Sequence, residues 1–333
     1  MEMSKRQGVW LLGMLLLLML GSGQASEGQM PDFATWLQEL RAEALAQGIS
    51  PRTLDEALTG VKPLERVVRF DRNQPEFKLT FARYFQRVVS PARVEKGRRL
   101  LREHKALLQA IQERYGVQPR FLVALWGMET DFGRLTGGFK VIDALVTLAY
   151  DPRRSRYFRR QLLDALRIID QGHVRATEMT GSWAGAMGQT QFMPSTFLRY
   201  AVDFDGDGRK DLWRSTADAL ASGAHYLARL GWRGDQTWGR EVRLPADFDP
   251  ALFGLEQRKR LSQWQALGVR RVDGRDLPRR DLPASLIQLD GDTEKPRHFL
   301  VYDNYRAIMG WNKSHHFATS VGILSDRIGR RRL

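Results

Sequence analysis

The chain has 333 residues, of which 43% are hydrophobic, so it can bury a core and is not a disordered chain. It contains no cysteine, which excludes disulfides, cysteine-based metal or nucleophile sites and a cysteine-linked lipid. The formal net charge of +14 favours a polyanionic partner and makes a nucleic-acid-binding protein the first alternative to consider.

The N-terminal segment has the pattern of a secretory signal peptide. Lys5 and Arg6 precede an apolar run over residues 9–20, and small residues lead to Ala25. About a dozen apolar residues are too few for a transmembrane helix, which needs roughly 20. We expect cleavage after Ala25, export, and no stable membrane anchor in the mature chain. Export and the spread of basic residues among acidic ones argue against nucleic acid as a partner.

Residues 26–112 predict an N-terminal helical lobe. Phe33, Trp36 and Leu40 are spaced at helical intervals. Ser50 and Ser90 each precede a proline, and serine at the N-cap followed by proline at the first helical position predicts a helix start.

Residues 113–232 predict a helical core, and Glu129 is its most informative residue. Helical patterns cover residues 119–133, 157–170, 194–202 and 217–230. In the first of these, Leu122, Leu125 and Trp126 share a face with Glu129. Burial among these side chains would raise the pKa of Glu129 into the range of a general acid that protonates an ether oxygen.

Asp131 is the nearest candidate for a second carboxylate. Side chains two residues apart on a helix point about 200° away from each other, so Asp131 cannot share the face of Glu129 if the helix continues. Gly133 permits the helix to end before that position. We therefore interpret Asp131 as a structural or solvated carboxylate.

An aspartate-rich loop follows at residues 203–211. Asp203, Asp205 and Asp207 occupy positions 1, 3 and 5 of a calcium-loop pattern, with Gly208 at position 6 and the Arg209 carbonyl at position 7. Position 12 is an arginine rather than the usual glutamate. The loop is either a structural Ca²⁺ or Na⁺ site or an aspartate-rich turn that binds no metal.

The remaining chain predicts a small α+β lobe over residues 233–302 and a C-terminal segment over residues 303–333. Short strands are expected at 241–244, 286–289 and 298–302 around a helix at 256–267. The fold class is therefore mainly α with a small α+β lobe.

Several motifs occur in one order along the chain: residues 126–133 (WGMETDFG), 143–148 (DALVTL), 181–197 (GSWAGAMGQTQFMPSTF), 201–208 (AVDFDGDG), 303–304 (DN) and 311–312 (WN). Together they resemble the membrane-bound lytic transglycosylase B family, which cleaves bacterial peptidoglycan. The resemblance implies a lysozyme-like core, a C-terminal segment that completes the cleft, and a periplasmic enzyme. Many relatives look like lipoproteins, so this cysteine-free chain is expected to be a soluble exported form.

The resemblance also implies a mechanism without a catalytic cofactor. Glu129 would be the sole acid and base, cleaving the β-1,4 bond between N-acetylmuramic acid and N-acetylglucosamine. The C6 hydroxyl of the sugar would attack C1 and leave a 1,6-anhydromuramoyl end, because intramolecular attack needs no second carboxylate.

Further residues carry over from the family motifs as substrate contacts or metal ligands. Ser182 would lie beside the glutamate, Gln191 and Asn312 would hold the N-acetyl group and hydroxyls, and Asp218 would close the metal site. Stacking would come from Tyr84, Phe192 and Tyr226, and carboxylate binding from Arg153 and Arg154. Each has a plainer alternative as a turn serine, a packing amide, a core aromatic, a helix cap or a solvated arginine. Relatives tend to have tyrosine where this chain has Trp311 and Phe317.

Two other functions stay open at this point. A hydrolytic muramidase would use water in place of the C6 hydroxyl, and a non-catalytic peptidoglycan-binding protein would keep the fold without the reaction.

Overall fold

The computed structural model describes residues 31–73, 79–291, 293 and 296–330. The predicted signal peptide, residues 1–25, lies outside the described residues. Within these ranges no helix combines the length and the apolar character that crossing a bilayer demands.

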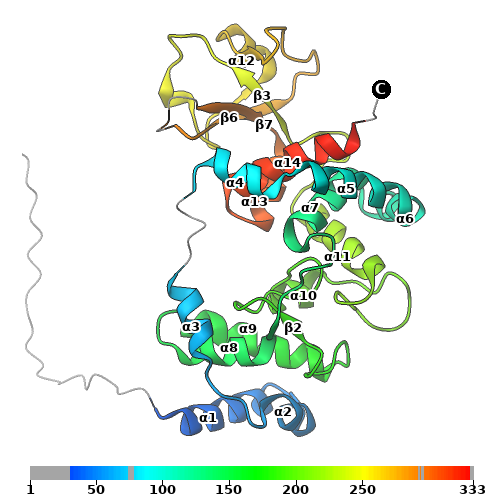
Figure 1. Cartoon of the computed structure of the whole chain (residues 1–333), viewed down its shortest axis with the longest axis vertical. Helices are drawn as coiled ribbons and strands as arrows, with labels where there is room; N and C mark the ends of the chain where they lie inside the picture. Colours follow the sequence, from blue (N-terminus) through cyan, green and yellow to red (C-terminus); the bar gives the residue numbers. More distant parts are fainter. Residues whose placement is uncertain (1–30, 74–78, 292, 294–295, 331–333) are drawn as a thin grey trace, which may run out of the picture.

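Helices make up most of the described chain (Figure 1). Those of the first half are α1 (Phe33–Ala46), α2 (Pro51–Leu58), α3 (Glu65–Arg72), α4 (Phe81–Val88), α5 (Pro91–Glu103), α6 (Lys105–Tyr115), α7 (Pro119–Thr130), α8 (Val141–Tyr150) and α9 (Ser155–Asp170). They are followed by α10 (Pro194–Tyr200), α11 (Thr216–Arg229), α12 (Leu261–Ala266), α13 (Asp303–Trp311) and α14 (His315–Gly329), with a 3-10 turn at Pro250–Leu252.

The strands form one small antiparallel sheet and a two-stranded pair. The pair joins β1 (Phe139–Lys140) to β2 (Thr180–Gly181). The sheet has the order β4-β6-β7-β3-β5 and comprises β3 (Gly239–Arg243), β4 (Arg258–Arg260), β5 (Arg270–Arg271), β6 (Pro283–Leu289) and β7 (Arg297–Val301). The expected fold class, mainly α with a small α+β lobe, is confirmed.

The two serine-proline starts are confirmed as helix caps. The Ser50 hydroxyl accepts from the backbone N–H of Thr53, and the Ser90 hydroxyl accepts from that of Arg93. Proline occupies the first turn in both helices, where its missing N–H leaves no bond unmade.

The first six helices divide between two cores. Trp36 and Leu40 of α1 are buried with the residues of α8 and α9, whereas Phe81 of α4 and Leu108 of α6 are buried with those of α7 and α14. Figure 1 shows this division, with α1, α2 and α3 beside α8 and α9 and with α4, α5 and α6 beside α7 and α14. The helices of residues 26–112 therefore brace α7 and α9 from separate sides.

The sheet lobe differs from its sequence-based description in one element. The helix expected at 256–267 begins only at Leu261, because Arg258–Arg260 forms a strand paired with residues 283–285 of β6. Trp264 of the shortened helix is completely buried under the sheet with Leu286. From this lobe the chain returns as α13 and α14, and α14 packs along α7 and α5 (Figure 1).

Candidate active site

Glu129 lies in the last turn of α7, on the stripe that the sequence predicted. Leu122, Leu125 and Trp126 line the same small cavity as its carboxyl. The other lining residues come from the glycine-rich loop and from α11 and α13: Thr190, Leu220, Gly223 and Trp311. The helical spacing thus places Glu129 among apolar groups, as expected.

This environment changes the acidity of the carboxyl. Burial raises the pKa of Glu129 to about 7, against a smaller downward effect of the hydrogen bond from Trp311. The Trp311 indole Nε1 donates to Glu129 Oε1 at 2.8 Å. At neutral pH the carboxyl is therefore divided between its neutral and ionised forms, which suits a group that must both give and take a proton.

The chain turns sharply directly after Glu129. Asp131, Phe132 and Gly133 have φ angles of 50°, 61° and 77°, so three consecutive residues occupy the left-handed region. Such a conformation costs about 1–2 kcal/mol for each residue that is not glycine. The α7 helix ends at Thr130, which is the early ending that Gly133 was expected to permit. Contacts with the surrounding structure must stabilise the strained turn.

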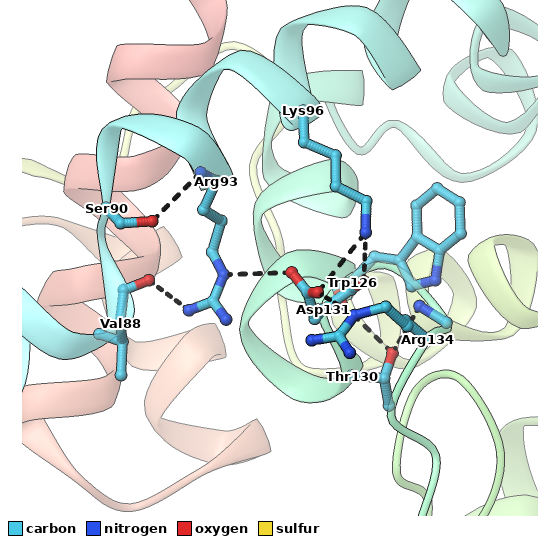
Figure 2. A network of polar contacts seen from close by, with 9 residues as sticks. Val88, Ser90, Arg93, Lys96, Trp126, Thr130, Asp131 and Arg134 are labelled. Atoms are coloured by element: carbon cyan, nitrogen blue, oxygen red, sulfur yellow. Dashed lines mark hydrogen bonds and ion pairs between the residues drawn. The ribbon is translucent and has the colours of Figure 1, made fainter.

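The Asp131 carboxylate is held on the side of α5, as Figure 2 shows. Arg134 Nε donates to it at 2.7 Å, Lys96 Nζ lies 3.5 Å away, and Arg93 Nε lies 3.7 Å away. Partial burial pushes its pKa upward, but the bond from Arg134 and the charges of Lys96 and Arg93 together hold the pKa of Asp131 below its usual value. The structural interpretation of Asp131 is confirmed.

The aromatic ring of Phe132 fixes the other half of the turn. It packs edge to face on Trp126, with ring centres 5.8 Å apart. It also covers Gly127, where an added Cβ would lie 2.7 Å from the ring. Glycine at position 127 therefore permits the close approach of the turn to its own helix.

Thr130 ties the end of α7 to the glycine-rich loop. Its hydroxyl donates to the Gln189 carbonyl at 2.8 Å and accepts from the Gly133 N–H at 3.0 Å. The loop that lines the Glu129 cavity is thus connected directly to the helix that carries Glu129.

Two of the predicted polar contacts, Ser182 and Gln191, lie in this loop and bond to backbone. The Ser182 hydroxyl accepts from the N–H groups of Ala184 and Ala186, at 3.3 and 3.0 Å. The Gln191 amide nitrogen donates to the carbonyls of Thr136 and Gly188, and its backbone has a φ of 50°. Both side chains brace the loop, and their predicted contacts with sugar stay predictions.

The aromatic candidates form one cluster around Trp311. Phe192 is 2% exposed and meets Trp311 edge-on at 5.4 Å, while Tyr226 lies against the indole at 5.4 Å. The other face of Tyr226 stacks on Tyr200 at 4.6 Å. These rings support the indole, so sugar stacking by Phe192 and Tyr226 stays a prediction.

The remaining predicted contacts are more peripheral. Asn312 is exposed at the end of α13, and its side-chain oxygen accepts from the Ser314 N–H. Tyr84 lies on α4 with its ring 5.8 Å from that of His316. Their contacts with substrate are untested.

The arginine pair has a clear structural partner. Arg153 and Arg154 both hold the carboxylate of Asp71, which is 5% exposed in α3, and Arg153 also donates to the Asp71 carbonyl. The pair ties α3 to the loop between α8 and α9, while each side chain stays more than two-fifths exposed. Binding of substrate carboxylates by these arginines stays a prediction.

The aspartate-rich loop brings two of its three predicted carboxylates, those of Asp203 and Asp205, together with that of Asp218, which the family resemblance implied. Oxygens of Asp203, Asp205 and Asp218 lie within 4.8 Å of one another. Asp218 is completely buried at the start of α11, and burial raises its pKa, with Asp205 contributing. Its two oxygens accept from the N–H groups of Phe204 and Asp211. Converging carboxylates, of which that of Asp218 is buried, fit a hard cation, which prefers oxygen ligands. The roles of Asp207 and the Arg209 carbonyl stay predictions.

The comparison with protein families decides the identity. The model described as Transglycosylase SLT domain matches residues 32–326. The chain belongs to the transglycosylase SLT domain family. It is a lytic murein transglycosylase, and the resemblance stated from the motifs is confirmed.

Characterised members of the family are similar over most of their length. Membrane-bound lytic murein transglycosylase B of Escherichia coli K12 is 32% identical over 305 residues, which is 86% of this chain and 80% of the relative. The crystal structure of SltB3 from Pseudomonas aeruginosa in complex with NAG-anhNAM-pentapeptide has a TM-score of 0.85 at 47% identity, covering 88% of this chain and 78% of that one. Slt35 of Escherichia coli in complex with calcium has a TM-score of 0.77 at 30% identity, covering 93% and 98%.

Three features of this transglycosylase were not predicted from the sequence. The bond from Trp311 to Glu129 joins residues 182 positions apart. The partners of Asp131 on α5 and the Asp71 partner of the arginine pair also come from other helices, outside the reach of a local pattern. Trp311 stood out as a departure from the family tyrosine, but no local pattern shows which atom its N–H reaches.

Proposed function

We propose that this transglycosylase cleaves the β-1,4 bond between N-acetylmuramic acid and N-acetylglucosamine with Glu129 as its sole acid and base. The single observation that carries the proposal is the placement of the Glu129 carboxyl among mostly apolar groups, where burial raises its pKa to about 7. Among the residues that the structure describes, Glu129 is the only carboxylate lining its cavity. Asp131, the nearest in sequence, is held by cations on α5.

We propose that the substrate's own C6 hydroxyl is the nucleophile, because an intramolecular attack needs no second carboxylate to position a water. Neutral Glu129 gives its proton to the glycosidic oxygen as the bond from that oxygen to C1 breaks, and the substrate's acetamido carbonyl stabilises C1. The resulting carboxylate takes the proton of the C6 hydroxyl as its oxygen bonds to C1. The product ends in 1,6-anhydromuramic acid, and Glu129 is neutral again, so acid and base are one residue.

The test is Glu129→Gln, which keeps the size of the side chain and removes its titration. We expect purified murein sacculi to keep their turbidity with the variant while it still sediments with them. Mass spectrometry of the wild-type products should show muramoyl ends lighter than reducing ends by one water. Unchanged clearing by the variant would overturn the assignment, and reducing ends would favour the hydrolytic muramidase.

The same enzyme is proposed to work in the periplasm. The pattern of residues 1–25 and the lack of cysteine support export as a soluble form. Fractionation of cells that express the full chain should recover it, shortened by the leader, in the periplasmic fraction; unprocessed protein in the cytoplasm would contradict this.

We further propose that the carboxylates of Asp203, Asp205 and Asp218 hold a structural Ca²⁺ or Na⁺ ion. A cation would neutralise three carboxylates that otherwise repel one another within 4.8 Å, and it would brace the loop against α11. Slt35, a similar protein, was crystallised in complex with calcium. Chemistry at the glycosidic bond is assigned to Glu129 and not to this ion.

A further inference from the structure

Within the described chain, the one hydrogen bond to the Glu129 carboxyl comes from the indole of Trp311. Its Nε1 donates to Oε1 at 2.8 Å, across the small cavity that the two residues share. Trp311 is the last residue of α13, and Glu129 lies in the last turn of α7. Two helix ends therefore meet at the reacting group.

The direction of this N–H is fixed by packing. Tyr226 lies against the indole with ring centres 5.4 Å apart and planes 37° apart, and Phe192 meets it at 62°. The Tyr226 hydroxyl also donates to the carbonyl of Gly310, the residue before Trp311, at 3.1 Å. Gly223 of α11 also lies beside the indole, where an added Cβ would be 3.4 Å from the outer ring atom, an ordinary contact distance. The indole cannot turn away without disturbing three neighbours.

We propose that Trp311 is a positioning residue, which holds the Glu129 carboxyl in one orientation and stabilises the carboxylate that the first reaction step produces. The inference rests on the proposed function of Glu129. This role needs a hydrogen-bond donor, because an N–H bonds more strongly to an ionised carboxylate than to a neutral carboxyl. Burial favours the neutral form that starts the reaction, and the indole N–H favours the ionised form that must follow.

The other titratable groups on and near α7 contact partners other than Glu129. Asp131 binds Arg134, Lys96 and Arg93, while Arg120 of α7 pairs with Asp326 of α14. His104, between α5 and α6, meets Trp126 edge-on, and the Tyr226 hydroxyl of α11 bonds to backbone. His315 of α14 lies on Tyr305, and His316 lies near Tyr84 and Phe81. Burial and Trp311 are the two causes that act on the pKa of Glu129.

The experiment removes the N–H and reads the titration of Glu129 directly. Trp311→β-(3-benzothienyl)alanine keeps the bicyclic shape and replaces N–H by sulfur, and Trp311→Phe is the encoded counterpart. The Glu129 carboxyl is followed by ¹³C NMR in glutamate-labelled protein, with Glu129→Gln assigning its signal. We expect its midpoint to rise by about one pH unit in both variants, since a donor bond to a charged group is lost.

A matched control is Trp213→Phe, which removes another indole donor. Trp213 Nε1 donates to the Thr180 carbonyl at 2.7 Å, in a region of the fold that does not line the Glu129 cavity. The control should leave the Glu129 midpoint where it is in the wild type. The alkaline midpoint of kcat/KM should behave in the same way as the NMR midpoint. It should move to higher pH in the Trp311 variants and stay unchanged in Trp213→Phe.

The outcomes separate this inference from the function on which it rests. A midpoint that stays within about 0.2 pH unit in the benzothienyl variant overturns the role of Trp311, even if Glu129→Gln is inactive. Continued clearing of murein by Glu129→Gln overturns the proposed function, whatever the titration shows. An equal shift in Trp213→Phe also overturns the inference, because the effect would then not depend on the bond.

Discussion

Glu129 and Asp131 are two residues apart in sequence and have opposite electrostatic environments. Mostly apolar side chains surround the first, the Trp311 indole donates to it, and burial raises its pKa to about 7. Three cations surround the second, and they hold the pKa of Asp131 below its usual value despite partial burial. The left-handed turn that begins at Asp131 produces this separation, because it ends α7 directly after Glu129 and carries the next carboxylate to α5. One short segment thus contains the proposed proton donor and the carboxylate that ties the end of its helix to α5.

The largest effect should come from Glu129→Gln, which should lower the activity and raise the stability of the folded protein. Activity on murein should fall by about 10²–10⁴-fold, the typical contribution of general acid and base catalysis. The variant should nevertheless unfold less readily at pH 8, by on the order of 3 kcal/mol, because the wild type must bury a charge whose pKa is raised from 4.5 to about 7. At pH 5 the gain should shrink to below about 1 kcal/mol, since folded Glu129 is then neutral. Urea unfolding at both pH values measures this; equal stability at both would contradict the raised pKa.

The pH dependence of the wild type should show the same group. Only neutral Glu129 can start the reaction, so kcat/KM should fall about tenfold per pH unit above a midpoint of about 7. The measurement is the initial rate of anhydromuramoyl product release from soluble glycan between pH 5 and 9. A profile that is flat up to pH 9 would show that a group other than Glu129 donates the proton.

Asp131→Asn tests whether the contacts of Asp131 with its three cations stabilise the fold. Asparagine tolerates the left-handed backbone at position 131, so the change removes charge without adding strain. The free energy of unfolding should fall by about 1–3 kcal/mol at neutral pH, because three cations lose their partner. The folded-state pKa of Asp131 is lowered, so its stabilising effect is present above pH 4 or so and is lost as the pH falls through that lowered value. Denaturant unfolding at pH 7 and pH 3 checks the sign.

The activity of folded Asp131→Asn protein sharpens the same test. We expect the alkaline midpoint of kcat/KM to stay at that of the wild type, because Asp131 is not a cause of the raised pKa of Glu129. A shift of that midpoint would show that the anchor and the acid are electrostatically coupled.

The smallest effect is expected at the aspartate-rich loop, where the carboxylates of Asp203, Asp205 and Asp218 lie close together. Chelation should lower the melting temperature by a few degrees, about 1 kcal/mol for a chain of this size, and added Ca²⁺ should restore it. Asp203→Asn should abolish the response to Ca²⁺, and Asp276→Asn, at an exposed carboxylate that pairs with Arg270, is the control. A melting temperature that ignores both chelator and Ca²⁺ would rule out the site.

Local sequence was sufficient for the features that depend on spacing alone. The stripe of Leu122, Leu125 and Trp126 placed Glu129 in an apolar cavity, and the serine-proline pairs marked two helix starts. The converging aspartates also followed from a loop pattern, except for the buried position of Asp218. The helix expected at 256–267 was too long because pairing with β6 outweighs helical periodicity in residues 258–260.

The sequence by itself determined that this protein is a mainly helical transglycosylase with Glu129 on the apolar face of one helix, since periodicity and ordered motifs act over a few residues. Only the tertiary structure decided which partner each polar atom near that carboxyl has. Trp311, Arg93 and Asp71 reach their partners from elements far away along the chain. Hydrogen bonds and charges act over a few ångströms in space, so their partners are fixed by how the helices pack and not by the order of the residues.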